Sequence, residues 1–112
     1  TLIYGWRTLD FLPGKSPMAI LSMRQESSAV SFAAKVLDIA SGKEYGFRLP
    51  ANTLGAFFYD GKVLVVLPSK LVYYSQKGEY LSETPLSETA DGAELIKGRV
   101  LLMSGDKLFL LP

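Results

Sequence analysis

Residues 61–74 read GKVLVVLPSKLVYY, and residues 98–111 read GRVLLMSGDKLFLL. The two segments align without a gap at an offset of 37 residues, and a Gly, a Val-Leu pair and a Lys-Leu pair are identical in both. In each segment a short turn, Pro68-Ser69 or Gly105-Asp106, separates two apolar runs of strand length. Such runs bounded by turn residues are typical of β-hairpins. The pair therefore predicts an antiparallel β-protein built from similar hairpins.

The rest of the chain has the same pattern, in which turn residues (Gly, Pro, Asp or Ser) follow short runs rich in Val, Leu, Ile, Phe and Tyr. This spacing indicates an all-β meander. We expect strands near residues 2–12, 18–23, 30–39, 44–49, 54–59, 62–67, 70–75, 79–86, 93–96, 99–103 and 107–111.

One stretch, residues 27–40 (SSAVSFAAKVLDIA), fits two structures. As a strand, it places the alternate residues Val30, Phe32, Ala34 and Val36 on one face. As an amphipathic helix, it would have Ser27 or Ser28 as N-cap and Gly42 just after its C-terminus. We favour the strand, and the helix stays open as the alternative.

A third copy of the pattern is fainter. Residues 35–50 (KVLDIASGKEYGFRLP) resemble residues 71–86 (LVYYSQKGEYLSETPL) at an offset of 35 or 36, depending on where a gap is placed. In both, an apolar strand leads into a polar turn containing Gly, then a strand that begins near Glu-Tyr, then Pro. The alternative is that any two β-hairpins look alike, because alternation and turn residues recur in all of them.

A period near 37 residues, with about four short strands in each unit, resembles the blade of a β-propeller. Residues 36–44 (VLDIASGKE) resemble the strand–turn–strand signature of quinoprotein-type repeats, and Gly78-Glu79-Tyr80 resembles a degenerate version. The resemblance covers roughly residues 18–112. The Trp that usually follows the turn is replaced by Tyr45-Gly46, so we infer no quinone cofactor. The Gly-His and Trp-Asp dipeptides of WD40 repeats are absent.

These observations predict one domain over residues 1–112: an all-β, β-propeller-like meander of about three blade-like repeats, with a small β-barrel or sandwich as the alternative. Closed propellers have four to eight blades, so three would leave two open flanks. We expect completion by self-association, with two copies forming a six-bladed ring, or by a larger propeller. Residues 1–12 (TLIYGWRTLDFL) could supply a strand to the C-terminal unit.

Composition excludes several function classes. The 112 residues carry 12 Lys+Arg against 11 Asp+Glu, so nucleic acid is an unlikely partner. His and Cys are absent, which removes the commonest general base and the commonest transition-metal ligands. The longest apolar run is far shorter than the ~20 residues of a membrane-spanning helix, so we expect no membrane partner.

Few residues suggest catalysis. Asp38 and Glu44 flank a turn, and carboxylates there are ordinarily solvated. Gly14-Lys15-Ser16 ends like a P-loop but lacks the earlier Gly. Five acids, with no Lys or Arg between Lys77 and Lys97, could attract a cation, but their spacing matches no EF-hand: Glu79, Glu83, Glu88, Asp91 and Glu94. We therefore expect no catalytic, cofactor or metal site.

The aromatic residues are more suggestive of binding. Phe57-Phe58-Tyr59 and Tyr73-Tyr74 place adjacent rings on opposite faces of their strands, and Trp6 adjoins Arg7. Exposed Tyr, Trp and Arg are typical of protein interfaces and of sugar-binding surfaces. The alternative is that neighbouring sheets cover both faces, which would make these rings core.

The sequence thus predicts a non-catalytic binding or scaffolding module. Its expected partner is another protein or a second copy of itself, and a glycan is possible. One alternative is a carboxylate-based hydrolase acting on glycans, with Asp38, Asp60 and Asp91 as its best acids. Another is a small barrel that binds single-stranded nucleic acid.

Overall fold

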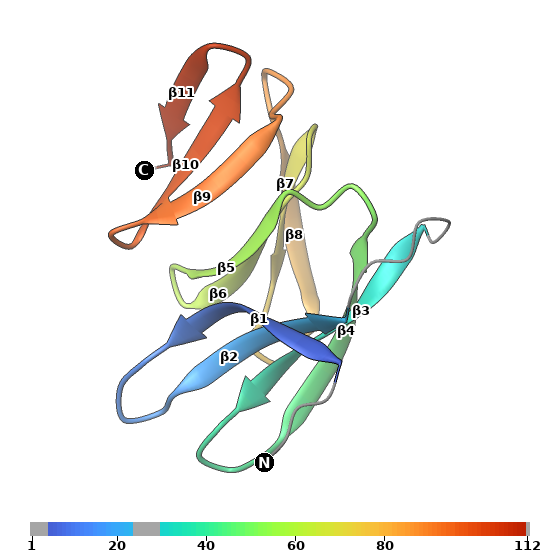
Figure 1. Cartoon of the computed structure of the whole chain (residues 1–112), viewed down its shortest axis with the longest axis vertical. Coiled ribbons are helices and arrows are strands. Elements are labelled where there is room, and N and C mark those ends of the chain that lie inside the picture. Colours follow the sequence, from blue (N-terminus) through green and yellow to red (C-terminus); the bar gives the residue numbers. More distant parts are fainter. Residues whose placement is uncertain (1–4, 24–29, 112) are drawn as a thin grey trace.

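The computed structural model describes residues 5–23 and 30–111, which form eleven strands in three antiparallel sheets (Figure 1). Each sheet is a meander of consecutive strands. The prediction of an all-β fold is confirmed, and every expected strand is present. The first sheet contains β1 (Trp6–Leu12), β2 (Met18–Met23), β3 (Ser31–Asp38) and β4 (Glu44–Pro50). The second contains β5 (Gly55–Tyr59), β6 (Lys62–Val66), β7 (Lys70–Tyr74) and β8 (Tyr80–Pro85), and the third contains β9 (Gly92–Ile96), β10 (Arg99–Ser104) and β11 (Lys107–Leu110).

The ambiguous stretch forms a strand over its described part. β3 pairs with β2 on one side and β4 on the other, which rules out a helix over Ser31–Asp38. Phe32, Ala34 and Val36 are buried on one face, as expected for a strand. Val30 is exposed, and residues 27–29 lie outside the described residues. Over residues 5–23 and 30–111 there is no helix able to cross a membrane.

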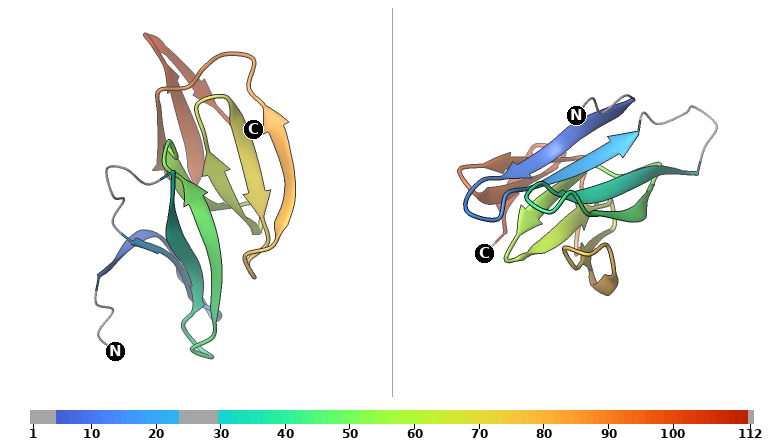
Figure 2. Two further views of the ribbon diagram at one scale, coloured as in Figure 1. Left: turned by 90° about the vertical axis from the view of Figure 1, so that its right-hand side faces the viewer. Right: turned by 90° about the horizontal axis from the view of Figure 1, so that it is seen from below.

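The three sheets stack face to face, so β5, β6 and β7 of the second sheet are covered on both sides (Figures 1 and 2), whereas β8 is exposed along its length. Val63 and Val65 of β6 pack toward the first sheet, with Ile20, Val36 and Leu49. The alternate residues Leu64 and Val66 pack toward the third sheet, with Val100 and Leu102. Burial of both faces explains why β6 reads as a continuous apolar run rather than as an apolar–polar alternation.

The hairpins that open the two aligned segments have the same turn geometry. Asp60 and Gly61 have φ angles of 52° and 73°, and Lys97 and Gly98 have φ angles of 49° and 76°. Two consecutive positive φ angles are typical of a type I′ turn, whose twist matches that of the flanking strands. Gly meets no steric penalty at the second position, which accounts for the shared Gly in both segments.

Strand register also corresponds between the second and third sheets at the offset of 37 residues. Leu64 pairs with Tyr73, and Leu101 pairs with Leu110. The N–H of Leu54 donates to the carbonyl of Val66, and the N–H of Asp91 donates to that of Met103, both over 2.8 Å. The correspondence therefore runs from residues 54–74 to 91–111. The correspondence thus begins before residues 61 and 98, where the sequence alignment began. A Gly-Ala pair at 55–56 and again at 92–93 is the sequence signal for this earlier part, which the alignment did not include.

The first strands of the three sheets lie next to one another, with β5 between β1 and β9. β1 pairs with β2 in the first sheet. The prediction that residues 1–12 supply a strand to the C-terminal unit is therefore wrong for residues 6–12, which form β1. A bulge at Leu9 shifts the register of β1. Beyond it, Asp10 accepts hydrogen bonds from the N–H groups of Phe11 at 2.9 Å and of Phe58 in β5 at 2.8 Å. None of the three sheets closes into a barrel over the described residues.

Candidate functional site

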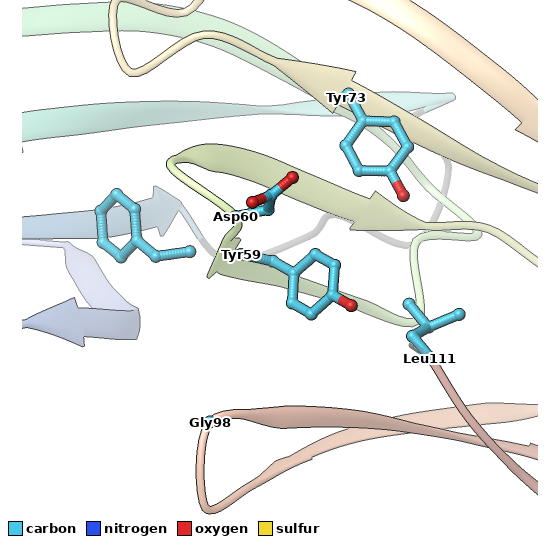
Figure 3. A pocket seen from close by; sticks show the side chains of 6 residues that line it. Tyr59, Asp60, Tyr73, Gly98 and Leu111 are labelled. Carbon is cyan, nitrogen blue, oxygen red and sulfur yellow. The ribbon is translucent and has the colours of Figure 1, made fainter.

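An open pocket of about 550 Å³ lies between the second and third sheets (Figure 3). Phe58, Tyr59, Asp60 and Tyr73 contribute from the second sheet, and Gly98 and Leu111 line it from the third. Its volume falls within the range of roughly 300–1,000 Å³ that is usual for small-molecule sites. The pocket thus combines three aromatic residues, two of which carry phenol hydroxyls, with one carboxylate and one leucine.

Strand alternation places the two tyrosines on the same face. Tyr73 pairs with Leu64, which pairs with Phe57 on its other side, and these residues face the third sheet. Tyr59 lies two residues beyond Phe57 and so faces the same way. Figure 3 shows both hydroxyl groups directed to the side where Leu111 lies, with the Gly98 turn across the gap. A side chain built at Gly98 would meet no atom within 4 Å, so this rim is unobstructed.

The charged groups of the pocket lie at its rim. The Lys62 Nζ atom is 3.8 Å from the Asp60 carboxylate and 5.8 Å from the centre of the Tyr73 ring. Burial raises the pKa of Tyr73 above its usual value, and the neighbouring Tyr59 and Asp60 raise it further. Tyrosine is already protonated at neutral pH and the shift keeps it so, which means that the Tyr73 hydroxyl can donate a hydrogen bond to a ligand.

We expect the chain to lose stability as pH rises above about 10, the usual pKa of tyrosine. Burial raises the pKa of both Tyr73 and Tyr74 in the folded chain, so each binds its proton more tightly folded than unfolded. The stability that these two tyrosines contribute is fully present below their pKa in the unfolded chain. It is lost as pH rises through their pKa in the folded chain. Denaturation by urea from pH 8 to 11 measures this. In the double variant Tyr73→Phe/Tyr74→Phe the free energy of unfolding should decline less steeply with pH. A decline equal to that of the wild type would contradict the role given to these two tyrosines.

A second candidate surface is the outer face of the third sheet. Its apolar residues are Ile96, Leu101, Met103, Leu108 and Leu110, and the charged Glu94 and Arg99 share the face. Leu101 pairs with Leu110 and Met103 with Leu108, so their side chains share a face. Leu108 is 65% exposed and Leu110 51%. At the offset of 37 residues Leu108 matches Leu71, which is only 4% exposed because the third sheet covers it. The outer face of the third sheet thus corresponds to the face of the second sheet that the third sheet covers, but no sheet covers it within the described part of the chain.

The acids that suggested a hydrolase belong to three separate turns. Asp38 accepts a hydrogen bond from the N–H of Ser41 at 3.3 Å, while Glu44 pairs with Lys35. Asp60 lies in the β5–β6 turn. Asp91 accepts from the N–H of Gly105 at 2.8 Å, which ties the start of β9 to the β10–β11 turn. These hydrogen bonds give Asp38 and Asp91 roles in turn geometry.

Two members of the acidic stretch pair with lysines from neighbouring strands. Glu83 accepts hydrogen bonds from Lys70 and from the Tyr80 hydroxyl, both at 3.0 Å, and these bonds lower its pKa. Glu88 accepts from Lys107 at 3.1 Å. Within the described ranges, no three acidic, His or Cys side chains come together as a metal site would require.

The remaining sequence candidates are divided between turns, core and surface. Gly14-Lys15-Ser16 is the exposed turn between β1 and β2. Phe57 is buried toward the third sheet, and Phe58 packs toward the first. The Tyr74 ring lies 5.1 Å from that of Phe47. The Nζ atom of Lys35 lies 4.1 Å from the centre of the Trp6 ring.

Sequence reasoning named Tyr59 and Tyr73 as aromatics but did not bring them together, and it missed Gly98 and Leu111 as pocket residues. Their convergence depends on how two sheets stack. The aligned turns at Asp60-Gly61 and Lys97-Gly98 were the available signal, because equivalent turns of stacked sheets lie at the same end. No protein-family model matches the chain, and no curated protein matches it at a significant level.

Proposed function

We propose that this chain is a non-catalytic binding and assembly module: a propeller-like stack of three blades that a second copy completes. The observation that carries the proposal is the exposure of Leu108 at a position equivalent to the buried Leu71. The outer face of the third sheet carries leucines at positions that, in the second sheet, pack against another sheet, with Glu94 where the second sheet has Phe57. Contiguous apolar surface of this kind is typical of association sites.

The chain itself offers a surface to cover that face. Phe11 and Met23 pair with Ala19 and Trp6 across β1 and β2, and so lie on the outward face of the first sheet. Phe11 is 52% exposed and Met23 37%. Contact between the third sheet of one copy and the first sheet of the other can occur twice in a two-copy ring, which closes the assembly. The net charge of +1 places little repulsion between copies.

The test is the solution mass, measured by light scattering coupled to size-exclusion chromatography. We expect twice the chain mass of 12.3 kDa for the wild type. The variant Leu108→Asp should elute as a folded monomer, because a charge buried in the contact is strongly unfavourable. Leu81→Asp is the matched control, since Leu81 is also an exposed strand leucine but lies in β8, outside the proposed contact.

A wild type that remains monomeric at high concentration would refute self-association. If Leu108→Asp and Leu81→Asp lowered the measured solution mass equally, association would not use the outer face of the third sheet. Circular dichroism of both variants separates dissociation from unfolding.

A further inference from the structure

We propose that the pocket between the β5–β6 and β9–β10 turns binds a carbohydrate, with Tyr59, Asp60 and Tyr73 as its polar contacts. The pocket lies within one chain, between its second and third sheets, so the inference does not depend on self-association. It goes beyond the assembly role by assigning a ligand class to a defined site.

The lining matches the two surfaces of a sugar. A sugar ring presents C–H groups on its faces and hydroxyl groups around its edge. Aromatic rings pack against the former, while their hydroxyl groups bond with the latter. Tyr59 and Tyr73 supply both kinds of contact, and Leu111 adds apolar surface opposite the hydroxyl ends (Figure 3).

The charges favour a neutral ligand over an ionic one. Two rings beside a carboxylate would also suit an organic cation. Here, however, the protein's own Lys62 ammonium lies 3.8 Å from Asp60 and 5.8 Å from the Tyr73 ring, so its positive charge would repel a bound cation. An anion would face the Asp60 carboxylate at the rim. A hydroxylated neutral molecule meets neither obstacle.

Each polar group has a distinct role in this site. The Asp60 carboxylate is an acceptor for two sugar hydroxyls, and hydrogen bonds to a charged acceptor are stronger than neutral ones. The Tyr73 hydroxyl, which is protonated at neutral pH as in any tyrosine, is a donor to a sugar oxygen. The turn at Gly98 leaves the entrance open, since no atom lies within 4 Å of the position a side chain would take.

The experiment is a titration of the isotope-labelled full chain, followed by amide NMR. The probes are methyl glucoside, methyl galactoside, N-acetylglucosamine and the disaccharides maltose and cellobiose, with tetramethylammonium and inorganic phosphate as ionic comparisons. We expect at least one sugar to shift the amides of residues 58–61 and 97–99 in a saturable manner. The two ions should leave these amides unchanged.

Two variants test the assigned contacts. Tyr73→Phe keeps the ring and removes the hydroxyl, so affinity for the bound sugar should fall about two- to tenfold. Asp60→Asn keeps a residue that tolerates a positive φ and removes the charge, so the fall should be at least as large. The matched control is Tyr80→Phe, because Tyr80 lies on β8 and bonds to Glu83 outside the pocket. Its affinity should equal that of the wild type.

Three results would overturn the inference: no saturable shift with any of the sugars, saturable binding of tetramethylammonium alone, or equal effects of Tyr73→Phe and Tyr80→Phe. The titration and the solution mass are independent measurements. A monomer that binds a sugar at these turns would refute self-association and retain the pocket, and a dimer that binds none would do the reverse.

Discussion

Truncating Leu71 to alanine is expected to lower the free energy of unfolding by about 2–5 kcal/mol, whereas the same truncation at Leu108 should change it by at most about 0.5 kcal/mol in dilute solution. Both leucines lie in the third strand of their sheets and at matching registers. Leu71 is 4% exposed and Leu108 65%. Removing a buried side chain costs its transfer free energy and leaves a cavity, and neither cost applies to an exposed one.

Urea denaturation of the two variants at one low protein concentration measures this difference. The pair controls for residue type and for register in the hairpin. The sites differ in coverage by a neighbouring sheet and in that β7 also pairs with β8, whereas β11 is an edge strand. Equal losses at both sites in dilute solution would contradict the stacking of the second and third sheets. A loss at Leu108 that grows with protein concentration would indicate that the outer face is covered by association.

Replacing Asp10 with alanine is expected to destabilise the chain by about 1–3 kcal/mol. One carboxylate oxygen accepts from the N–H of Phe11 and the other from the N–H of Phe58, which lies on the neighbouring sheet. Alanine leaves both donors without this acceptor. Asparagine has a single oxygen, so Asp10→Asn should lose about half as much.

The free energies of unfolding of both variants, obtained from urea denaturation, check the order wild type, Asp10→Asn, Asp10→Ala. Glu79→Ala is a suitable control, because Glu79 is an exposed acid in the β7–β8 turn. If Asp10→Ala lost no more stability than Glu79→Ala, the hydrogen bond from Phe58 to Asp10 would not contribute to the stability of the chain.

Local sequence patterns were sufficient to predict the strands. Apolar runs and turn residues located all eleven, because each hairpin is specified by residues adjacent in the chain. Alternation favoured a strand for β3 and left a helix open, and in the structure Phe32, Ala34 and Val36 of this strand face the core. The aligned hairpins predicted which strands have equivalent positions in their sheets.

Contacts between sheets could not be predicted in the same way. Asp10 and Phe58 are 48 residues apart, and no local pattern marks a carboxylate that will accept from a backbone N–H of another sheet. The role of β1 was mistaken for the same reason, since an isolated apolar run does not specify its partner strand. The pocket combines residues from two sheets, and its shape depends on how those sheets are stacked.

The meander connectivity has a consequence for how fast the chain folds. Within each sheet every strand hydrogen-bonds only to strands adjacent to it in the sequence. Such pairing closes short loops and has a small entropic cost, so the hairpins should form early and quickly for a β-protein. Docking of one completed sheet onto the next joins residues that are much farther apart. We therefore expect this docking step, rather than strand pairing, to limit the rate of folding.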